Sequence, residues 1–137
     1  MKGETFVDTS GFYALLVGGD ERHRRAKNYL ARAARSGATF VTTDYVLDET
    51  ATLLLMRGHG HLLEELFAAL ATSRACRTEW MDPERFEDTR RLFLKHRDQG
   101  FSFTDCFSFL VMKELGLSRA LSSDRHFRVA GFEPLLA

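Results

Sequence analysis

The chain has 137 residues, of which 45% are hydrophobic and 28% charged, and these proportions exclude a disordered or fibrous protein. A chain of this length is typical of one compact domain, which we expect to span residues 1–137. The 19 Lys and Arg residues balance the 19 Asp and Glu residues, so net charge indicates no class of partner. Binding to a nucleic acid would therefore depend on local basic patches.

The first half of the chain alternates short β-prone runs with segments whose apolar residues recur at helical spacing. In chain order, the pattern predicts a strand at Thr5–Val7, a helix that ends at Gly18, a helix between Asp20 and Gly37, a strand at Thr39–Thr42, and a helix from Thr43 or Asp44 to Gly58. Aspartate, threonine and serine at the expected starts cap helices through their side chains, and glycine commonly ends a helix.

The second half continues this alternation. In order, it predicts a helix with Leu62, Leu63, Leu66, Phe67 and Leu70 on its apolar face, a strand at Ala75–Glu79, a helix that begins at Asp82-Pro83-Glu84, a helix from Thr104 to Leu115, and strands at Ala120–Ser122 and Phe132–Leu135. Phe86, Phe93 and Leu94 are expected on the buried side of the helix that begins near residue 82. The helix from Thr104 has few polar residues and should be central, and Pro134 places the last strand at a sheet edge.

Neither a membrane segment nor a secretion signal is expected. Residues 1–8 contain no apolar signal segment, and no apolar run approaches the ~20 residues that span a bilayer. The two cysteines, Cys76 and Cys106, show neither CxxC nor zinc-ligand spacing. We therefore expect a cytoplasmic protein with reduced thiols, although two cysteines also permit one disulfide.

Short strands that alternate with helices are typical of βαβ units. The predicted fold class is α/β, with a mainly parallel central sheet sandwiched by helices. Ligands of such sheets bind beyond the carboxyl ends of the strands, so a functional site is expected there.

Four carboxylates fall near this expected crevice. Asp8 directly follows the first strand, Asp124 follows closely on the strand at Ala120–Ser122, Asp105 lies in the first turn of the apolar helix, and Glu49 lies inside the third helix. Converging carboxylates repel one another unless protons or cations intervene, and oxygen-rich sites suit Mg²⁺ or Mn²⁺. Such ions activate bound water and stabilise charge on a phosphoryl group under attack. The pattern therefore favours metal-assisted phosphodiester hydrolysis.

Each of these acids also has a purely structural explanation. Asp8 could cap the first helix, and Asp105 could form a capping box with Ser102. Asp124 could be a turn residue, and Glu49 could point to solvent. Only the joint placement of the four acids favours a site.

Four segments carry a family resemblance. Phe6-Val7-Asp8-Thr9-Ser10, Asp48-Glu49-Thr50, Phe103-Thr104-Asp105-Cys106 and Leu121-Ser122-Ser123-Asp124-Arg125-His126-Phe127 resemble the four acidic motifs of PIN-domain proteins, especially the VapC-type toxins of toxin–antitoxin pairs. The similarity extends to Gly131–Leu135. It implies an α/β/α sandwich and an Mg²⁺- or Mn²⁺-dependent endoribonuclease that hydrolyses RNA with a metal-activated water. It also implies a homodimer and a small antitoxin protein that blocks the site.

The resemblance assigns roles to individual residues. Asp8, Glu49, Asp105 and Asp124 would form the acidic, metal-binding quartet, and Ser10 and Ser122 would support the metal-bound water or the phosphate. Asp44 and Asp48 make the second motif ambiguous. Adjacent helical positions differ by about 100°, so Asp48 and Glu49 cannot both point equally well at one metal. Glu49 is favoured, with Asp48 in reserve.

Basic residues offer further contacts. Arg125 and His126 follow Asp124 closely enough to contact a substrate phosphate, although His126 could instead pack or cap the turn before Phe127. The second helix carries six basic residues, Arg22, Arg24, Arg25, Lys27, Arg32 and Arg35. They could be a solvated face, or they could bind RNA or an acidic antitoxin segment.

Three other functions compete with a toxin ribonuclease. A phosphatase of the haloacid-dehalogenase type also has an Asp after its first strand, but its motif resembles Asp-x-Asp, and Ser10 stands at the third position here. A PIN-domain ribonuclease of RNA processing or quality control would carry the same acids. A non-cleaving PIN-like module that binds RNA or a partner would suit a chain that lacks acids, and none is missing. The small chain favours the toxin.

Overall fold

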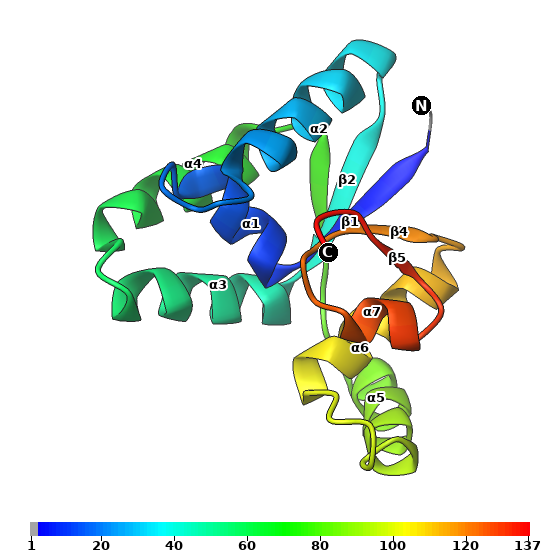
Figure 1. Ribbon diagram of the computed structural model, residues 1–137. Helices are drawn as coiled ribbons and strands as arrows, with labels where there is room; N and C mark the ends of the chain where they lie inside the picture. The colour runs from blue at the N-terminus through cyan, green and yellow to red at the C-terminus, as the bar shows by residue number, and fades with distance from the viewer. Residues whose placement is uncertain (1–2) are drawn as a thin grey trace.

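The computed structural model describes residues 3–137, in which five strands form one sheet in the order β3-β2-β1-β4-β5 (Figure 1). All neighbouring strands are parallel, which confirms the predicted α/β class. The strands are β1 (Glu4–Val7), β2 (Thr39–Thr43), β3 (Cys76–Glu79), β4 (Arg119–Leu121) and β5 (Glu133–Pro134). The last strand lies at an edge, as the proline predicted.

Helices cover both faces of this sheet. They are α1 (Thr9–Leu16), α2 (His23–Ser36), α3 (Asp44–Met56), α4 (Leu63–Thr72), α5 (Pro83–Lys95), α6 (Phe103–Glu114) and α7 (His126–Val129), with a short 3₁₀ turn η1 (Gly60–Leu62) before α4. Figure 1 shows α1, α2 and α4 on one side of the sheet and α5, α6 and α7 on the other. Helix α3 packs against both α1 and α6, so it connects the two layers.

The direction of strand addition reverses beside β1. The chain adds β2 and then β3 on one side of β1, and β4 and β5 follow on its other side. The pairing places Phe6 beside Val41 of β2 and Val7 beside Leu121 of β4. A reversal of this kind opens a crevice at the carboxyl ends of the strands. Asp8 and Ser122 are the first residues beyond those ends.

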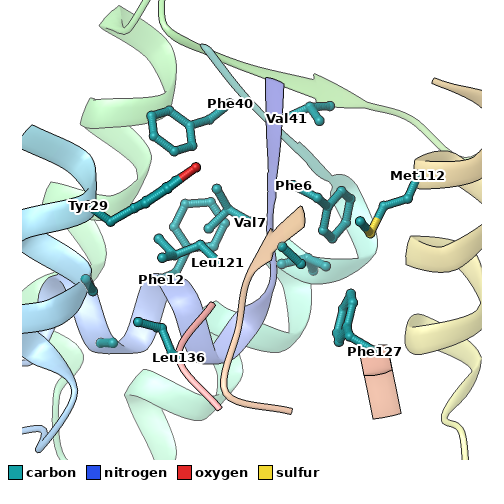
Figure 2. Packing of buried hydrophobic residues seen from close by; sticks show 14 of the residues in the cluster. Phe6, Val7, Phe12, Tyr29, Phe40, Val41, Met112, Leu121, Phe127 and Leu136 are labelled. Carbon is teal, nitrogen blue, oxygen red and sulfur yellow. The ribbon is translucent and has the colours of Figure 1, made fainter. Parts of the chain in front are cut away.

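The core lies on both faces of β1, because successive side chains of a strand point to opposite faces (Figure 2). Phe6 faces Met112 of α6 and Phe127 of α7, with 6.4 Å between the centroids of the Phe6 and Phe127 rings. Val7 faces the other layer, toward Phe12 of α1. All five side chains are buried, and each contributes about 1.5–3 kcal/mol through burial. Packing on both faces fixes the end of β1, from which the chain enters the crevice.

Local signals set several helix ends as predicted, but the predicted cap at Asp20 was wrong, because α2 begins at His23 with Arg22 as its N-cap and no side-chain cap. The Thr43 hydroxyl, rather than the Asp44 carboxylate, caps α3 by accepting a hydrogen bond from the Val46 amide at 3.1 Å. Gly37 ends α2 in the left-handed conformation, with a φ of 73°. Helix α6 is buried along most of its length, which confirms its predicted central position.

The prediction was wrong for three apolar side chains. Phe67 of α4 is 52% exposed, and on α5 Phe86 and Leu94 are 45% and 40% exposed. Helix α5 packs mainly against α6. Its Leu92 packs against the core cluster, whereas Phe86 and Leu94 do not, and Thr89 is its buried member. Periodicity locates an apolar stripe but not what covers it.

The two cysteines are not joined in a disulfide. Cys76 and Cys106 are free thiols, and burial raises the pKa of each to about 11, so neither is an activated nucleophile. No helix within residues 3–137 combines the length and hydropathy that a bilayer-spanning segment needs.

Candidate active site

Asp8 is a buried carboxylate at the end of β1, with only 5% of its surface exposed. It occupies the N-cap position of α1, but its side chain makes no capping hydrogen bond. Instead, Asp8 Oδ2 accepts hydrogen bonds from the hydroxyls of Ser122 at 2.8 Å and Ser10 at 3.2 Å. Burial raises the pKa of Asp8 to about 6, the Ser122 hydrogen bond opposes this, and the charges of Asp105 and Asp124 add to it.

The same two hydroxyls fix the turn after β4. Ser122 Oγ accepts from the Asp124 amide at 3.0 Å, and Ser10 Oγ accepts from the Ser123 amide at 2.9 Å. Asp124 Oδ1 in turn accepts from the His126 amide at 2.9 Å, so Asp124 is a turn residue as well as a neighbour of Asp8. These bonds hold the Asp124 carboxylate in a defined position relative to Asp8.

A glycine allows the two segments to approach. A Cβ atom on Gly11 would lie 2.1 Å from the carbonyl oxygen of Leu121, far inside van der Waals contact. Only glycine therefore lets the first turn of α1 pack against the end of β4. No local sequence pattern indicates this role, because it depends on a contact between residues 110 positions apart in the chain.

Asp105 forms the predicted capping box and also lines the pocket. Its side chain accepts from the Ser102 amide at 3.0 Å, and its own amide donates to Ser102 Oγ at 2.9 Å, which completes the predicted capping box at the start of α6. Burial raises the pKa of Asp105, with a further contribution from the charge of Asp124. Helix α6 thus presents a second buried carboxylate to the crevice.

His126 lies beside these carboxylates. Its Nδ1 is 3.2 Å from Asp124 Oδ1 and 3.7 Å from Asp105 Oδ2. One ligand atom from each of Asp105, Asp124 and His126 lies within 4.8 Å of the others, a spacing that can hold a metal ion. Of these ligand atoms, the carboxylate oxygens of Asp105 and Asp124 are the kind that Mg²⁺ and Mn²⁺ prefer, whereas an imidazole nitrogen suits softer transition metals.

A pocket of about 320 Å³ is lined by all four acids of the predicted quartet, Asp8, Glu49, Asp105 and Asp124. Thr9 also lines it, and the buried Thr9 hydroxyl has no hydrogen-bond partner among residues 3–137. A buried hydroxyl without a partner costs about 1–3 kcal/mol. The carboxylate oxygens that line the pocket are the donors that a divalent metal such as Mg²⁺ prefers, so the residues present fit such an ion.

Other predicted residues lie outside the pocket lining. Asp48 is exposed and does not line the pocket, and the same holds for Arg125. Asp44 Oδ1 accepts from the Met81 amide at 3.0 Å, which gives it a structural role between α3 and the segment after β3. In the basic α2, Arg25 donates to the carbonyl of Leu135 at 3.0 Å, so part of that helix fixes the C-terminal segment.

Several lining residues were not predicted as part of the site, among them Tyr13, Asp20, Leu53 and Arg57. A signal for two of them was present, because Glu49, Leu53 and Arg57 are spaced by four and share one face of α3. Tyr13 gave no signal, since its position depends on how α1 packs against α3.

Comparisons with known proteins identify the family of this chain. The PIN domain model matches residues 5–133. Two proteins named 23S rRNA-specific endonuclease VapC20, from Mycobacterium tuberculosis strains CDC 1551 / Oshkosh and ATCC 25618 / H37Rv, are each 36% identical over 127 residues. Each match covers 93% of this chain and 94% of the relative. The crystal structure of M. tuberculosis VapC20, described as a sarcin–ricin loop cleaving toxin, matches with a TM-score of 0.81 and 34% identity, and covers 93% of this chain and 95% of that one.

Proposed function

This chain belongs to the PIN-domain family, and from that premise we propose that it is a metal-dependent endoribonuclease, the toxin of a type II toxin–antitoxin pair. The observation that carries the proposal is the buried carboxylate of Asp8 in one pocket with Glu49, Asp105 and Asp124. Burial of several acids together is costly without a cation, so their convergence supports a metal site.

Asp8, Asp105, Asp124 and Glu49 are proposed to hold Mg²⁺ or Mn²⁺. When bound, such an ion supplies a polarised water and stabilises the negative charge that develops on the phosphoryl group. The two serine hydroxyls orient the Asp8 carboxylate, because both donate to the same oxygen, Oδ2. Ser10 and Ser122 therefore support the site rather than act as nucleophiles.

His126 is proposed to contact the substrate. Its Nδ1 faces Asp124, and its ring lies edge-on to Phe101 with 5.5 Å between the ring centroids. Phe101 thereby fixes the orientation of the imidazole beside the carboxylates. Arg125 is exposed next to it and is proposed to bind a phosphate farther from the acids.

Relatives indicate which RNA to test first. The similar proteins are named as specific for 23S rRNA, and the similar crystal structure is that of a toxin that cleaves the sarcin–ricin loop. We propose a structured loop of ribosomal RNA as the substrate of this chain. A synthetic sarcin–ricin stem-loop is a direct probe.

The test is cleavage of that stem-loop by the purified protein. We expect cleavage with Mn²⁺ or Mg²⁺, none with EDTA, and a loss of about 10³-fold in rate for Asp8→Asn, whose circular dichroism should match the wild type. Asp98→Asn, in the exposed segment after α5, is the matched control and should keep the wild-type rate. Unchanged cleavage by the Asp8→Asn, Asp124→Asn double variant would exclude this mechanism.

A small antitoxin and a second copy of the chain are the proposed protein partners. Exposed apolar side chains such as Met56 and Trp80, 79% and 65% exposed, are of the kind that association buries. Light scattering on a sizing column tests the dimer. A small protein encoded beside this chain that co-purifies with it and inhibits cleavage would support a toxin. Its absence would favour a ribonuclease of RNA processing.

A further inference from the structure

We propose that Arg57, oriented by the ring of Tyr13, binds a backbone phosphate of the RNA strand next to the phosphate at the acidic cluster. This inference rests on the proposed ribonuclease function and names a substrate-binding residue for it.

Arg57 lies at the far end of one wall of the pocket. Glu49, Leu53 and Arg57 line that wall from α3 at intervals of four residues. Eight residues of α-helix span about 12 Å, so the acid and the cation stand at opposite ends of the wall. Arg57 is therefore positioned to bind a phosphate next to the one at the acidic cluster, and not the phosphate at the acidic cluster itself.

The charge of Arg57 is free for a ligand. Among residues 3–137, no carboxylate forms an ion pair with it. The other arginine that lines the pocket, Arg22, is engaged by Glu21 at 2.9 Å and by the carbonyl of Leu136 at 3.1 Å. Of the two, only Arg57 retains an unneutralised guanidinium.

Tyr13 fixes the orientation of that guanidinium without neutralising it. The Arg57 Cζ atom lies 5.3 Å from the centroid of the Tyr13 ring, a cation–π distance. On the Tyr13 ring, His59 makes an edge contact with 5.8 Å between centroids. A guanidinium held over the face of an aromatic ring keeps N–H donors available for phosphate oxygens.

The charge of the pocket explains why such a residue is needed. Five carboxylates line it: Asp8, Asp20, Glu49, Asp105 and Asp124. A metal at the acids can offset the charge of one phosphate, but RNA carries a phosphate at every nucleotide. Neutralising the charge of the neighbouring phosphate requires a second positive group, and the Arg57 guanidinium is the one in the pocket that no carboxylate among the described residues neutralises.

A structural role for Arg57 is the competing explanation. It occupies the C-cap of α3, where a positive charge stabilises the helix. Arg57→Lys keeps that charge but loses the planar fork, whereas Arg57→Ala loses both. The two variants therefore separate helix stabilisation from phosphate binding.

The experiment measures binding of a fluorescent sarcin–ricin stem-loop RNA with Mn²⁺ over a series of salt concentrations. All proteins carry Asp8→Asn to prevent cleavage. The variants added are Arg57→Ala, Arg57→Lys and the control Arg74→Ala, which removes an exposed arginine just before β3, at the opposite end of the sheet.

We expect Arg57→Ala to weaken binding about tenfold and to lower the slope of log K against log salt by about 0.7–0.9. Arg57→Lys should keep the slope and lose about threefold in affinity. Arg74→Ala should change neither quantity.

Wild-type affinity and slope in Arg57→Ala would overturn the inference, as would a lower melting temperature with an unchanged slope. Cleavage by the protein without Asp8→Asn is measured separately. Failure of the ribonuclease proposal would appear there as absent cleavage, whereas failure of the Arg57 proposal appears only in the binding slopes.

Discussion

The two walls of the acidic pocket differ in how their side chains are held. At the carboxyl ends of β1 and β4, Asp8 is buried and accepts hydrogen bonds from Ser10 and Ser122. The same two hydroxyls accept hydrogen bonds from backbone amides of the turn after β4. On α3, Glu49 is exposed and makes no side-chain hydrogen bond within residues 3–137. Arg57, at the end of that helix, lies over the ring of Tyr13 and forms no ion pair within the same residues.

This difference separates two tasks. The buried wall defines the positions of the carboxylates, and its desolvation cost appears as the raised pKa of Asp8. The exposed wall costs little to form and leaves its charges available to a ligand. Changes in the first wall should therefore affect the free energy of unfolding, and changes in the second should affect only binding and catalysis.

The largest effect on stability is expected from Gly11→Ala. The added methyl would collide with the Leu121 carbonyl, which is backbone and cannot rotate away, so α1 must shift from β4. We expect a loss of about 3 kcal/mol in the free energy of unfolding, measured with urea, together with slower cleavage.

Gly18→Ala is the matched control, because a Cβ at Gly18 meets nothing within 4 Å. Its free energy of unfolding should stay within about 1 kcal/mol of the wild type. Wild-type stability of Gly11→Ala would show that the buried wall is not as rigid as its contacts indicate.

A second effect is the pH dependence of stability without metal. The pKa of Asp8 rises from 3.8 to about 6 on folding, so the folded chain holds a proton that the unfolded chain releases. The contribution of Asp8 is therefore fully present below pH 3.8 and is lost as pH rises through about 6. The loss corresponds to at most about 3 kcal/mol.

Asp8→Asn isolates this contribution, because it removes the titrating group and keeps its shape. In EDTA, the wild type should lose stability relative to Asp8→Asn between pH 4 and about 6.5, and Mn²⁺ should reverse that loss by binding the carboxylate. Parallel pH profiles of the two proteins would contradict the burial of a desolvated carboxylate at the end of β1.

The buried wall could be predicted from sequence to a large extent. Asp8 and Asp124 follow strands, and parallel strands end at the same edge, so their approach needed only the topology. Local capping rules likewise located Thr43 and Gly37 at helix ends. These features depend on interactions over a few residues or on the alternation of strands and helices.

The exposed wall was less predictable, since it depends on how helices pack. Arg57 gains its role from Tyr13, 44 positions earlier, and no local pattern joins them. The prediction of the buried side of α5 was wrong for the same reason: Thr89 is buried, whereas Phe86 is 45% exposed. Which face of a helix is covered follows from its neighbours and not from its own periodicity.

The smallest expected effect distinguishes two adjacent acids on α3. Glu49 lines the pocket, whereas Asp48, rotated by about 100° on the helix, does not. We expect Glu49→Gln to lower the cleavage rate about tenfold at limiting Mn²⁺, with recovery at higher Mn²⁺, and Asp48→Asn to leave the rate unchanged.

Both acids are exposed, so neither variant should change the free energy of unfolding by more than about 0.5 kcal/mol. A rate loss in Asp48→Asn alone would show that α3 is rotated when metal is bound. A clear loss of stability in Glu49→Gln would instead mean that Glu49 belongs to the fixed, buried wall. Both walls of the pocket would then contribute to the stability of the fold, and the distinction between a wall that positions carboxylates and a wall that binds ligand would be wrong.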